Sequence, residues 1–176
     1  MKIAVVSYSH TGNNNRLATC VARDLSAVHV KINTQKPITM GSIILDMIFN
    51  RTPKVHPDPE VLKQYDLILF FTPVWMGRIA SPLRAYLHAL KLTPKAYGFL
   101  SISGGADGEN PKLLAELINR TGMKPAILLD QHIKDCIHQN RRPTRKDTSA
   151  YKISETEASS LSTIAITEIN KLLIQG

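Results

Sequence analysis

Long apolar runs, cysteines and a leader pattern are absent or scarce in this sequence. No stretch reaches the roughly 18 consecutive apolar residues that a membrane-spanning helix requires. Cys20 and Cys136 are the two cysteines, and cysteines so far apart in the chain provide no disulfide framework. The apolar run over residues 3–6 is too short for the core of a signal peptide. We therefore expect a cytoplasmic protein that does not insert into a membrane.

Acidic and aromatic residues are also few. The chain has 14 Asp and Glu residues against 22 Lys and Arg residues, so its formal net charge is +8. Such a charge favours anionic ligands or acidic partners. Aromatic residues make up only 6% of the chain, and no nucleic-acid-binding motif or basic-aromatic stripe accompanies the charge. We expect no specific nucleic-acid partner.

The rest of the composition is that of an ordinary globular protein. Of 176 residues, 43% are hydrophobic and 20% are charged. This length is enough to bury a substantial core in one unit. The sequence therefore predicts a single domain over residues 1–176.

Strand and helix patterns alternate along the whole chain. Apolar, partly β-branched segments predict strands over residues 2–7, 28–32, 66–71, 96–103 and 125–130. Apolar spacings of three and four residues predict helices over 13–26, 42–49, 82–90, 113–118 and 155–174, with one or two helical turns over 59–65. Ser81 is the expected N-cap of the helix that begins at Pro82, and Gly122 is the expected end of the helix over 113–118. Residues 134–152 are basic and show no period. The alternation predicts an α/β fold with a parallel sheet covered by helices on both faces.

Polar loops follow three of the predicted strands. They cover residues 9–14, 73–78 and 103–107, after the first, third and fourth strands. In an open parallel sheet, ligands bind at the carboxyl ends of the strands, where the strand order reverses. These three loops are therefore expected to form one site.

The first of these loops has the character of a phosphate site. The sequence Ser-Tyr-Ser-His-Thr-Gly-Asn-Asn-Asn, residues 7–15, joins a strand directly to a helix. Short side chains, free backbone N–H groups and the positive end of a helix dipole all favour a phosphate group.

In sequence, the three loops together resemble those of the flavodoxin family, over most of the chain. Ser9, Thr11 and Gly12 match the Ser/Thr-x-Thr-Gly-x-Thr phosphate turn of that family, and Asn14 replaces its last threonine with another hydrogen-bond donor. Residues 73–77, Pro-Val-Trp-Met-Gly, are similar to the family's flavin-ring loop, with Trp75 as the aromatic residue that packs on the ring. Residues 103–107, Ser-Gly-Gly-Ala-Asp, resemble its second ring-binding segment.

This resemblance implies a doubly wound five-stranded parallel sheet of order 2-1-3-4-5 and FMN as cofactor. It implies no catalytic side chain, because the flavin N5 performs the chemistry, and no metal site. The cofactor-binding residues that it implies are Ser9, His10, Thr11, Gly12, Asn13, Asn14, Pro73, Val74, Trp75, Met76, Gly77, Ser103, Gly104, Gly105 and Asp107.

The sequence departs from electron-carrier flavodoxins in ways that bear on function. Those carriers are typically acidic and stack a tyrosine on the flavin soon after the third loop, whereas here Asp107 is followed by Gly-Glu-Asn-Pro. An unstacked flavin face would admit a nicotinamide or a quinone. We therefore predict an oxidoreductase that passes electrons from NAD(P)H to a quinone or similar small-molecule acceptor. The alternative is a flavodoxin-type carrier that serves a redox partner protein, and a homodimer is expected by analogy with related reductases.

Two further interpretations compete with this one, and the basic run near the end of the chain has more than one possible role. Cys136 and Arg142 have the Cys-x5-Arg spacing of phosphotyrosine phosphatases, although the loop between them has no glycine. A flavodoxin-like fold that has lost its cofactor could serve as an interaction module. The basic run Arg141, Arg142, Arg145 and Lys146 is expected to be a solvated loop, with contact to an NADPH phosphate or an acidic partner as its functional options.

Overall fold

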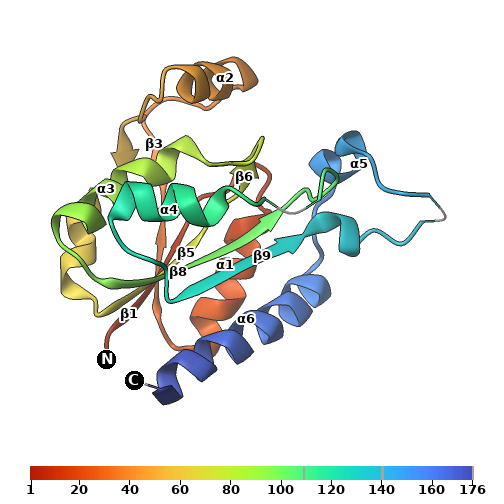
Figure 1. The fold of residues 1–176 in the computed structure, drawn as a ribbon. Helices are drawn as coiled ribbons and strands as arrows, with labels where there is room; N and C mark the ends of the chain where they lie inside the picture. The colour runs from red at the N-terminus through yellow and green to blue at the C-terminus, as the bar shows by residue number, and fades with distance from the viewer. Residues whose placement is uncertain (109, 140, 176) are drawn as a thin grey trace.

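A five-stranded parallel sheet forms the centre of the protein (Figure 1). The computed structural model describes residues 1–108, 110–139 and 141–175. The strands are β1 (Ile3–Ser7), β2 (Val28–Lys31), β5 (Leu67–Phe71), β8 (Ala96–Ser103) and β9 (Ile127–His132). Their spatial order is β2-β1-β5-β8-β9, and each pair is parallel. Counted along the sheet's own strands, this order is 2-1-3-4-5, so the predicted fold class is confirmed.

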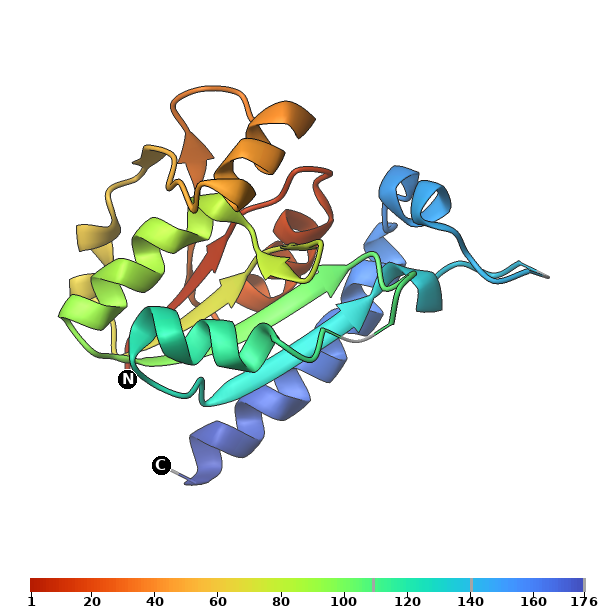
Figure 2. The same ribbon diagram turned by 45° about the horizontal axis from the view of Figure 1, so that its top comes forward.

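Helices cover both faces of this sheet (Figure 2). Alternate residues of β1 pack into the cores on opposite faces of the sheet, because successive side chains of a strand point to opposite sides. Ala4 and Val6 join the core under α3 (Arg84–Leu92) and α4 (Leu113–Thr121). Val5 joins the core under α1 (Asn13–Asp24) and α6 (Glu155–Gln175). Burial on both faces explains why the strands read as continuous apolar runs.

Of the two predicted helix ends, the one at Gly122 is confirmed and the one at Ser81 is wrong. Gly122 caps α4 in the left-handed conformation at φ 77°, as expected. Ser81 was expected to cap the helix beginning at Pro82, and this is wrong. Ser81 is the first residue of a 3-10 turn, η2 (Ser81–Leu83), and its hydroxyl donates to the carboxylate of Asp46 at 2.8 Å. The Ser81 hydroxyl therefore binds a buried carboxylate from a distant segment and does not cap the helix.

Small elements interrupt the main alternation. The chain between β2 and β5 forms an antiparallel pair, β3 (Asn33–Thr34) with β4 (Val55–His56), which brackets α2 (Met40–Ile48). A 3-10 turn, η1 (Pro59–Gln64), leads into β5. After β5, a hairpin of β6 (Val74–Trp75) and β7 (Arg78–Ile79) forms before α3. The two short strand pairs were not predicted, because each strand has only two residues and shows no periodicity.

The basic segment after β9 is more ordered than its pattern indicated. It contains a 3-10 turn, η3 (Ile133–Asp135), and a short helix, α5 (Arg145–Ala150). Thr144 and Asp147 form a reciprocal capping box at the start of α5. The expectation of an aperiodic segment over 134–152 is therefore wrong for residues 145–150. Among the described residues, no helix is both long and apolar enough to cross a membrane.

Candidate functional site

One large cleft opens at the carboxyl ends of β1, β5 and β8. Its volume is about 1090 Å³, which slightly exceeds the roughly 300–1,000 Å³ of most small-molecule sites. The three loops predicted to converge all contribute to it. Its walls are completed by α2 and α5 and by the residues after the third loop. The lining includes His10, Thr11, Asn14, Met40, Ile43, Ile44, Trp75, Met76, Gly104, Gly105, Asp107, Arg145, Thr148 and Ser149.

The first loop wraps around the side chain of Ser9. Its hydroxyl oxygen accepts the backbone N–H of Gly12 at 2.9 Å and that of Asn14 at 3.2 Å. Gly12 has φ 96°, a left-handed conformation that suits glycine, and it stands immediately before α1. The first turn of α1 carries no acidic residue, so nothing there opposes an anion at the helix N-terminus.

The two asparagines at the start of α1 brace the loop against other parts of the chain. The Asn14 side chain donates to the carbonyl of Ile102 at 2.9 Å and accepts its N–H at 3.0 Å, which ties the first loop to β8. Asn13 is 2% exposed; its amide donates to the carbonyl of Tyr151, and its oxygen accepts the N–H of Ile153. Asn13 thus secures the approach to α6.

Most of the predicted cofactor residues lie on the cleft, and a few lie behind it. Ser9, Gly12 and Asn13 shape the first loop and are not part of the lining. The predicted residues that do line the cleft are His10, Thr11, Asn14, Pro73, Val74, Trp75, Met76, Gly77, Ser103, Gly104, Gly105 and Asp107.

The second loop is the tight turn of the β6–β7 hairpin. Met76 and Gly77, its central residues, have φ 48° and 75°, as a type I′ hairpin turn requires. Trp75 packs edge-on against Tyr8, with ring centroids 5.8 Å apart, and against His10 at 6.3 Å. Burial raises the pKa of Tyr8 to about 12, so this ring remains uncharged beside the cleft. These contacts hold Trp75 of the second loop against the first loop.

The third loop passes closely over neighbouring side chains. Gly105 has φ 71°, and a Cβ atom there would lie 2.5 Å from Cβ and Cγ of His132. A Cβ atom on Gly104 would lie 3.0 Å from the Thr148 hydroxyl. Only glycine fits at Gly105 without displacing His132, so this residue lets the third loop lie directly against β9.

Asp130 organises the support beneath the third loop. Its carboxylate accepts the Ser103 hydroxyl at 3.1 Å and the Asn110 amide at 2.6 Å, and it pairs with Nε2 of His132 at 3.3 Å. The sequence reasoning assigned no role to Asp130. Its position near the end of the fifth strand was the available signal, because that edge carries the site.

Arginines of the basic segment hold the outer side of the third loop. Arg145 Nε donates to both carboxylate oxygens of Asp107 at 2.9 Å, and Arg142 donates to the carbonyl of Ala106 at 3.1 Å. Arg145, Thr148 and Ser149 also line the cleft. The basic side chains Arg141, Arg142, Arg145 and Lys146 are exposed, as expected of a solvated run. The expectation of a loop is wrong for residues 145–150, because they form α5, which is a wall of the cleft.

An apolar wall stands on the α2 side of the cleft. Met40, Ile43 and Ile44 line it there, although the sequence reasoning placed no site residue in that helix. The pattern of α2 predicted a helix but gave no indication of where the helix would lie. Its position depends on contacts between Asp46, Ser81 and Arg84, which are remote in sequence.

The environment of Cys136 does not suit phosphatase chemistry. Burial raises the pKa of its thiol, and Glu157 and Asp135 add to this effect, whereas a nucleophilic thiolate needs a lowered pKa. The guanidinium of Arg142 is directed at the carbonyl of Ala106. Across the described residues, no group of three or more His, Cys, Asp and Glu side chains is arranged to hold a metal ion.

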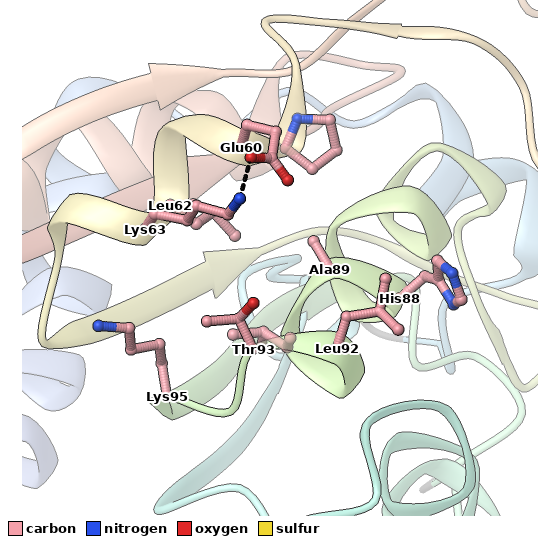
Figure 3. A pocket seen from close by; sticks show the side chains of 10 residues that line it. Glu60, Leu62, Lys63, His88, Ala89, Leu92, Thr93 and Lys95 are labelled. Carbon is pink, nitrogen blue, oxygen red and sulfur yellow. Dashed lines mark ion pairs between the residues drawn. The ribbon is translucent and has the colours of Figure 1, made fainter.

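A second, smaller cavity of about 170 Å³ lies between η1 and α3 (Figure 3). Glu60 and Lys63 form an ion pair on one side of it, and His88, Leu92 and Lys95 lie on the other. These segments precede β5 and β8, so the cavity is at the opposite edge of the sheet from the large cleft.

Comparison with known proteins supports the fold. No family model and no curated protein matches the sequence. Among solved structures, a flavoprotein from Lactobacillus acidophilus in complex with FMN has a TM-score of 0.60 and 17% identity, covering 74% of this chain and 93% of its own. A Bacteroides uniformis structure described as a flavoprotein has a TM-score of 0.65 and 19% identity, covering 75% and 90%. Oxidised flavodoxin 2 from Bacillus cereus has a TM-score of 0.51 and 15% identity, covering 97% and 99%.

The chain has a flavodoxin-like fold. The family resemblance inferred from the three loops is thus confirmed at the level of the fold.

Proposed function

We propose that this flavodoxin-like protein binds FMN in the large cleft and passes electrons from NAD(P)H to a quinone or similar acceptor. The observation that carries the proposal is the convergence of the three predicted loops on one cleft, beside the N-terminus of α1. A loop at a helix N-terminus that opens on a large cleft at the same sheet edge suits a flavin mononucleotide.

The first loop would hold the phosphate end of FMN. His10 and Thr11 are exposed on the cleft, and Gly12 leaves the backbone uncovered at the helix start. The Ser9 oxygen accepts two backbone amides, so its own proton is free to donate in another direction. The absence of acidic residues from the first turn of α1 removes any repulsion of a phosphate dianion there.

The second and third loops would hold the ring end. Trp75 supplies an aromatic surface on the cleft, and Gly104 and Gly105 allow close approach to the backbone of the third loop. When bound, FMN supplies the one- and two-electron chemistry. The chain's own residues position the ring: Arg145 fixes the third loop through Asp107, and Asp130 supports it from beneath.

Two features of the cleft favour a reductase over a pure carrier. Its volume of about 1090 Å³ lies at the upper limit of small-molecule sites, which favours a site that admits a second reactant beside the flavin. The apolar side chains of Met40, Ile43 and Ile44 on its α2 wall suit a quinone-like acceptor. The net charge of +8 also differs from the acidic character of carriers.

Titration with FMN tests the binding proposal. We expect saturable quenching of flavin fluorescence by the wild-type chain. Thr11→Ala should bind FMN about ten- to hundredfold more weakly, because a hydrogen bond to a charged group contributes about 1.5–3 kcal/mol. Thr163→Ala is the matched control, since Thr163 is exposed on α6. Failure of the wild type to bind FMN would refute the proposal.

Anaerobic addition of NADPH or NADH to the FMN-loaded protein tests the reductase activity. Loss of the visible flavin band without a partner protein is the expected result. Persistence of the band, with FMN still bound, would identify a flavodoxin-type carrier instead.

A further inference from the structure

The outward face of α2 is almost entirely apolar. Exposed fractions are 64% for Met40, 43% for Ile44, 44% for Leu45, 68% for Ile48 and 66% for Phe49, the residue that ends the helix. Surface helices normally turn their apolar stripe toward the core and their polar residues toward water. Here the arrangement is reversed, which indicates that something covers this face.

The reversed orientation is fixed by buried polar contacts. Asp46 is 6% exposed and accepts the Ser81 hydroxyl at 2.8 Å, and Nη1 of Arg84 donates to the Asp46 carbonyl at 2.9 Å. Rotating α2 to bury its apolar face would break these hydrogen bonds and expose Ile43, which is 4% exposed. The apolar face is therefore held outward by the fold.

Basic side chains flank this face. Lys36, Arg51 and Lys54 are exposed on the segments that lead into and out of α2. Asp46 is the single acidic residue from position 35 to 57; it is buried, and one of its carboxylate oxygens lies 3.8 Å from Nε of Arg51. Lys36 and Lys54 therefore carry the charge of the rim that no acidic residue of this segment offsets. A second copy of this chain would bring one basic rim against another, which is repulsive. An anionic surface is complementary to both the rim and the charge of +8.

The shape of the segment distinguishes among anionic surfaces. α2 stands at the margin of the molecule, outside the layers formed by α3 and α4 and by α1 and α6 (Figures 1 and 2). A protruding helix with aliphatic and phenylalanine side chains can enter a planar lipid interface, with lysines and arginine at the headgroup level. A protein partner would instead need a matching apolar groove with an acidic rim.

We propose that α2 and its flanking residues Lys36, Arg51 and Lys54 form a docking surface for an anionic lipid membrane. Met40 and Ile44 belong both to this surface and to the wall of the large cleft, so docking would open the cleft onto the lipid. An acceptor dissolved in the membrane could then reach the site. This link to the acceptor rests on the proposed function, whereas the docking itself does not.

Vesicle sedimentation tests the apolar part of the surface. We expect the wild type to sediment with vesicles of phosphatidylcholine and phosphatidylserine. The double variant Ile48→Ser/Phe49→Ser should bind them at least tenfold more weakly, because burial of these two apolar side chains in the lipid supplies a large part of the binding free energy. Neither residue lines the cleft, so the affinity for FMN should not change. Leu92→Ser is the matched control, because Leu92 is 71% exposed at the far end of α3.

A charge pair tests the basic rim. Lys36→Gln/Lys54→Gln should weaken binding to the mixed vesicles by roughly thirtyfold, because each basic residue near an anionic surface contributes about 1 kcal/mol. Lys91→Gln/Lys124→Gln removes two exposed lysines elsewhere and should have a much smaller effect. Vesicles of phosphatidylcholine alone should bind the wild type weakly.

Several results would overturn the docking proposal. They are absence of sedimentation, equal binding by Ile48→Ser/Phe49→Ser, and a dimer in sedimentation equilibrium that the same double variant dissociates. Failure to bind the vesicles, together with normal FMN binding, removes the docking surface and leaves the proposed function intact. Vesicle binding without FMN binding removes the proposed function and leaves the docking surface intact.

Discussion

The fit of the third loop over His132 can be tested with one added methyl group. In Gly105→Ala, the new Cβ would lie 2.5 Å from Cβ and Cγ of His132, well inside van der Waals contact. The residue would also have to adopt φ 71°, which disfavours alanine by about 1–2 kcal/mol. His132 is 8% exposed and pairs with Asp130, so it has little room to move away.

Gly108→Ala separates the two contributions. Gly108 has φ 94°, but a Cβ atom there would meet nothing within 4 Å. Both variants share the backbone strain, and only Gly105→Ala adds the clash. Overpacking of this kind costs about 1–3 kcal/mol, and for a chain of this size each 1 kcal/mol lowers Tm by roughly 2–4 °C.

Urea unfolding of the wild type and both variants, followed by far-UV circular dichroism, measures this difference. We expect Gly108→Ala to lose about 1–2 kcal/mol from backbone strain, and Gly105→Ala to lose about 1–3 kcal/mol more from the clash. Because the third loop would shift, Gly105→Ala should also bind FMN more weakly than Gly108→Ala. Equal free energies of unfolding for the two variants would refute the close contact with His132.

Three other perturbations follow from the same geometry. Arg145→Gln should leave the free energy of unfolding nearly unchanged, because the pair with Asp107 is exposed, yet weaken FMN binding by freeing the third loop; an unchanged FMN titration would contradict this. Ser81→Ala should lower the free energy of unfolding in urea by about 1–3 kcal/mol, because it removes a hydrogen-bond donor from the buried carboxylate of Asp46; an unchanged free energy of unfolding would contradict this. Burial, with a smaller contribution from Lys31, lowers the pKa of His29 from 6.5 to about 4. The unfolded chain therefore binds that proton at a higher pH, and stability decreases as the pH is lowered from about 6.5 to 4; unfolding measured across that range should change less in His29→Gln than in the wild type.

Much of the architecture follows from local patterns. The apolar runs of β1, β5 and β8 can only be strands buried on both faces, because no helical spacing fits them and each ends in polar loop residues. The alternation with amphipathic helices predicts the parallel sheet that the structure shows, whereas the order of its strands was implied by the family resemblance. The failures concern short elements, such as the β6–β7 hairpin and α5, where two to six residues carry too little periodicity to be recognised.

The five-stranded parallel sheet and the edge at which three polar loops meet could be read from the amino-acid order, because both follow from apolar periodicity and from where each strand ends. The surroundings of that edge could not. Asn14 binds Ile102, Asp130 supports the third loop, and Arg145 holds Asp107 through contacts between segments remote in the chain. The outward apolar face of α2 has the same origin, since the buried contacts of Asp46, and not the hydrophobic pattern of the helix, set its orientation. Local patterns record which residues avoid water, whereas such long-range polar pairing depends on the folded chain bringing its partners together.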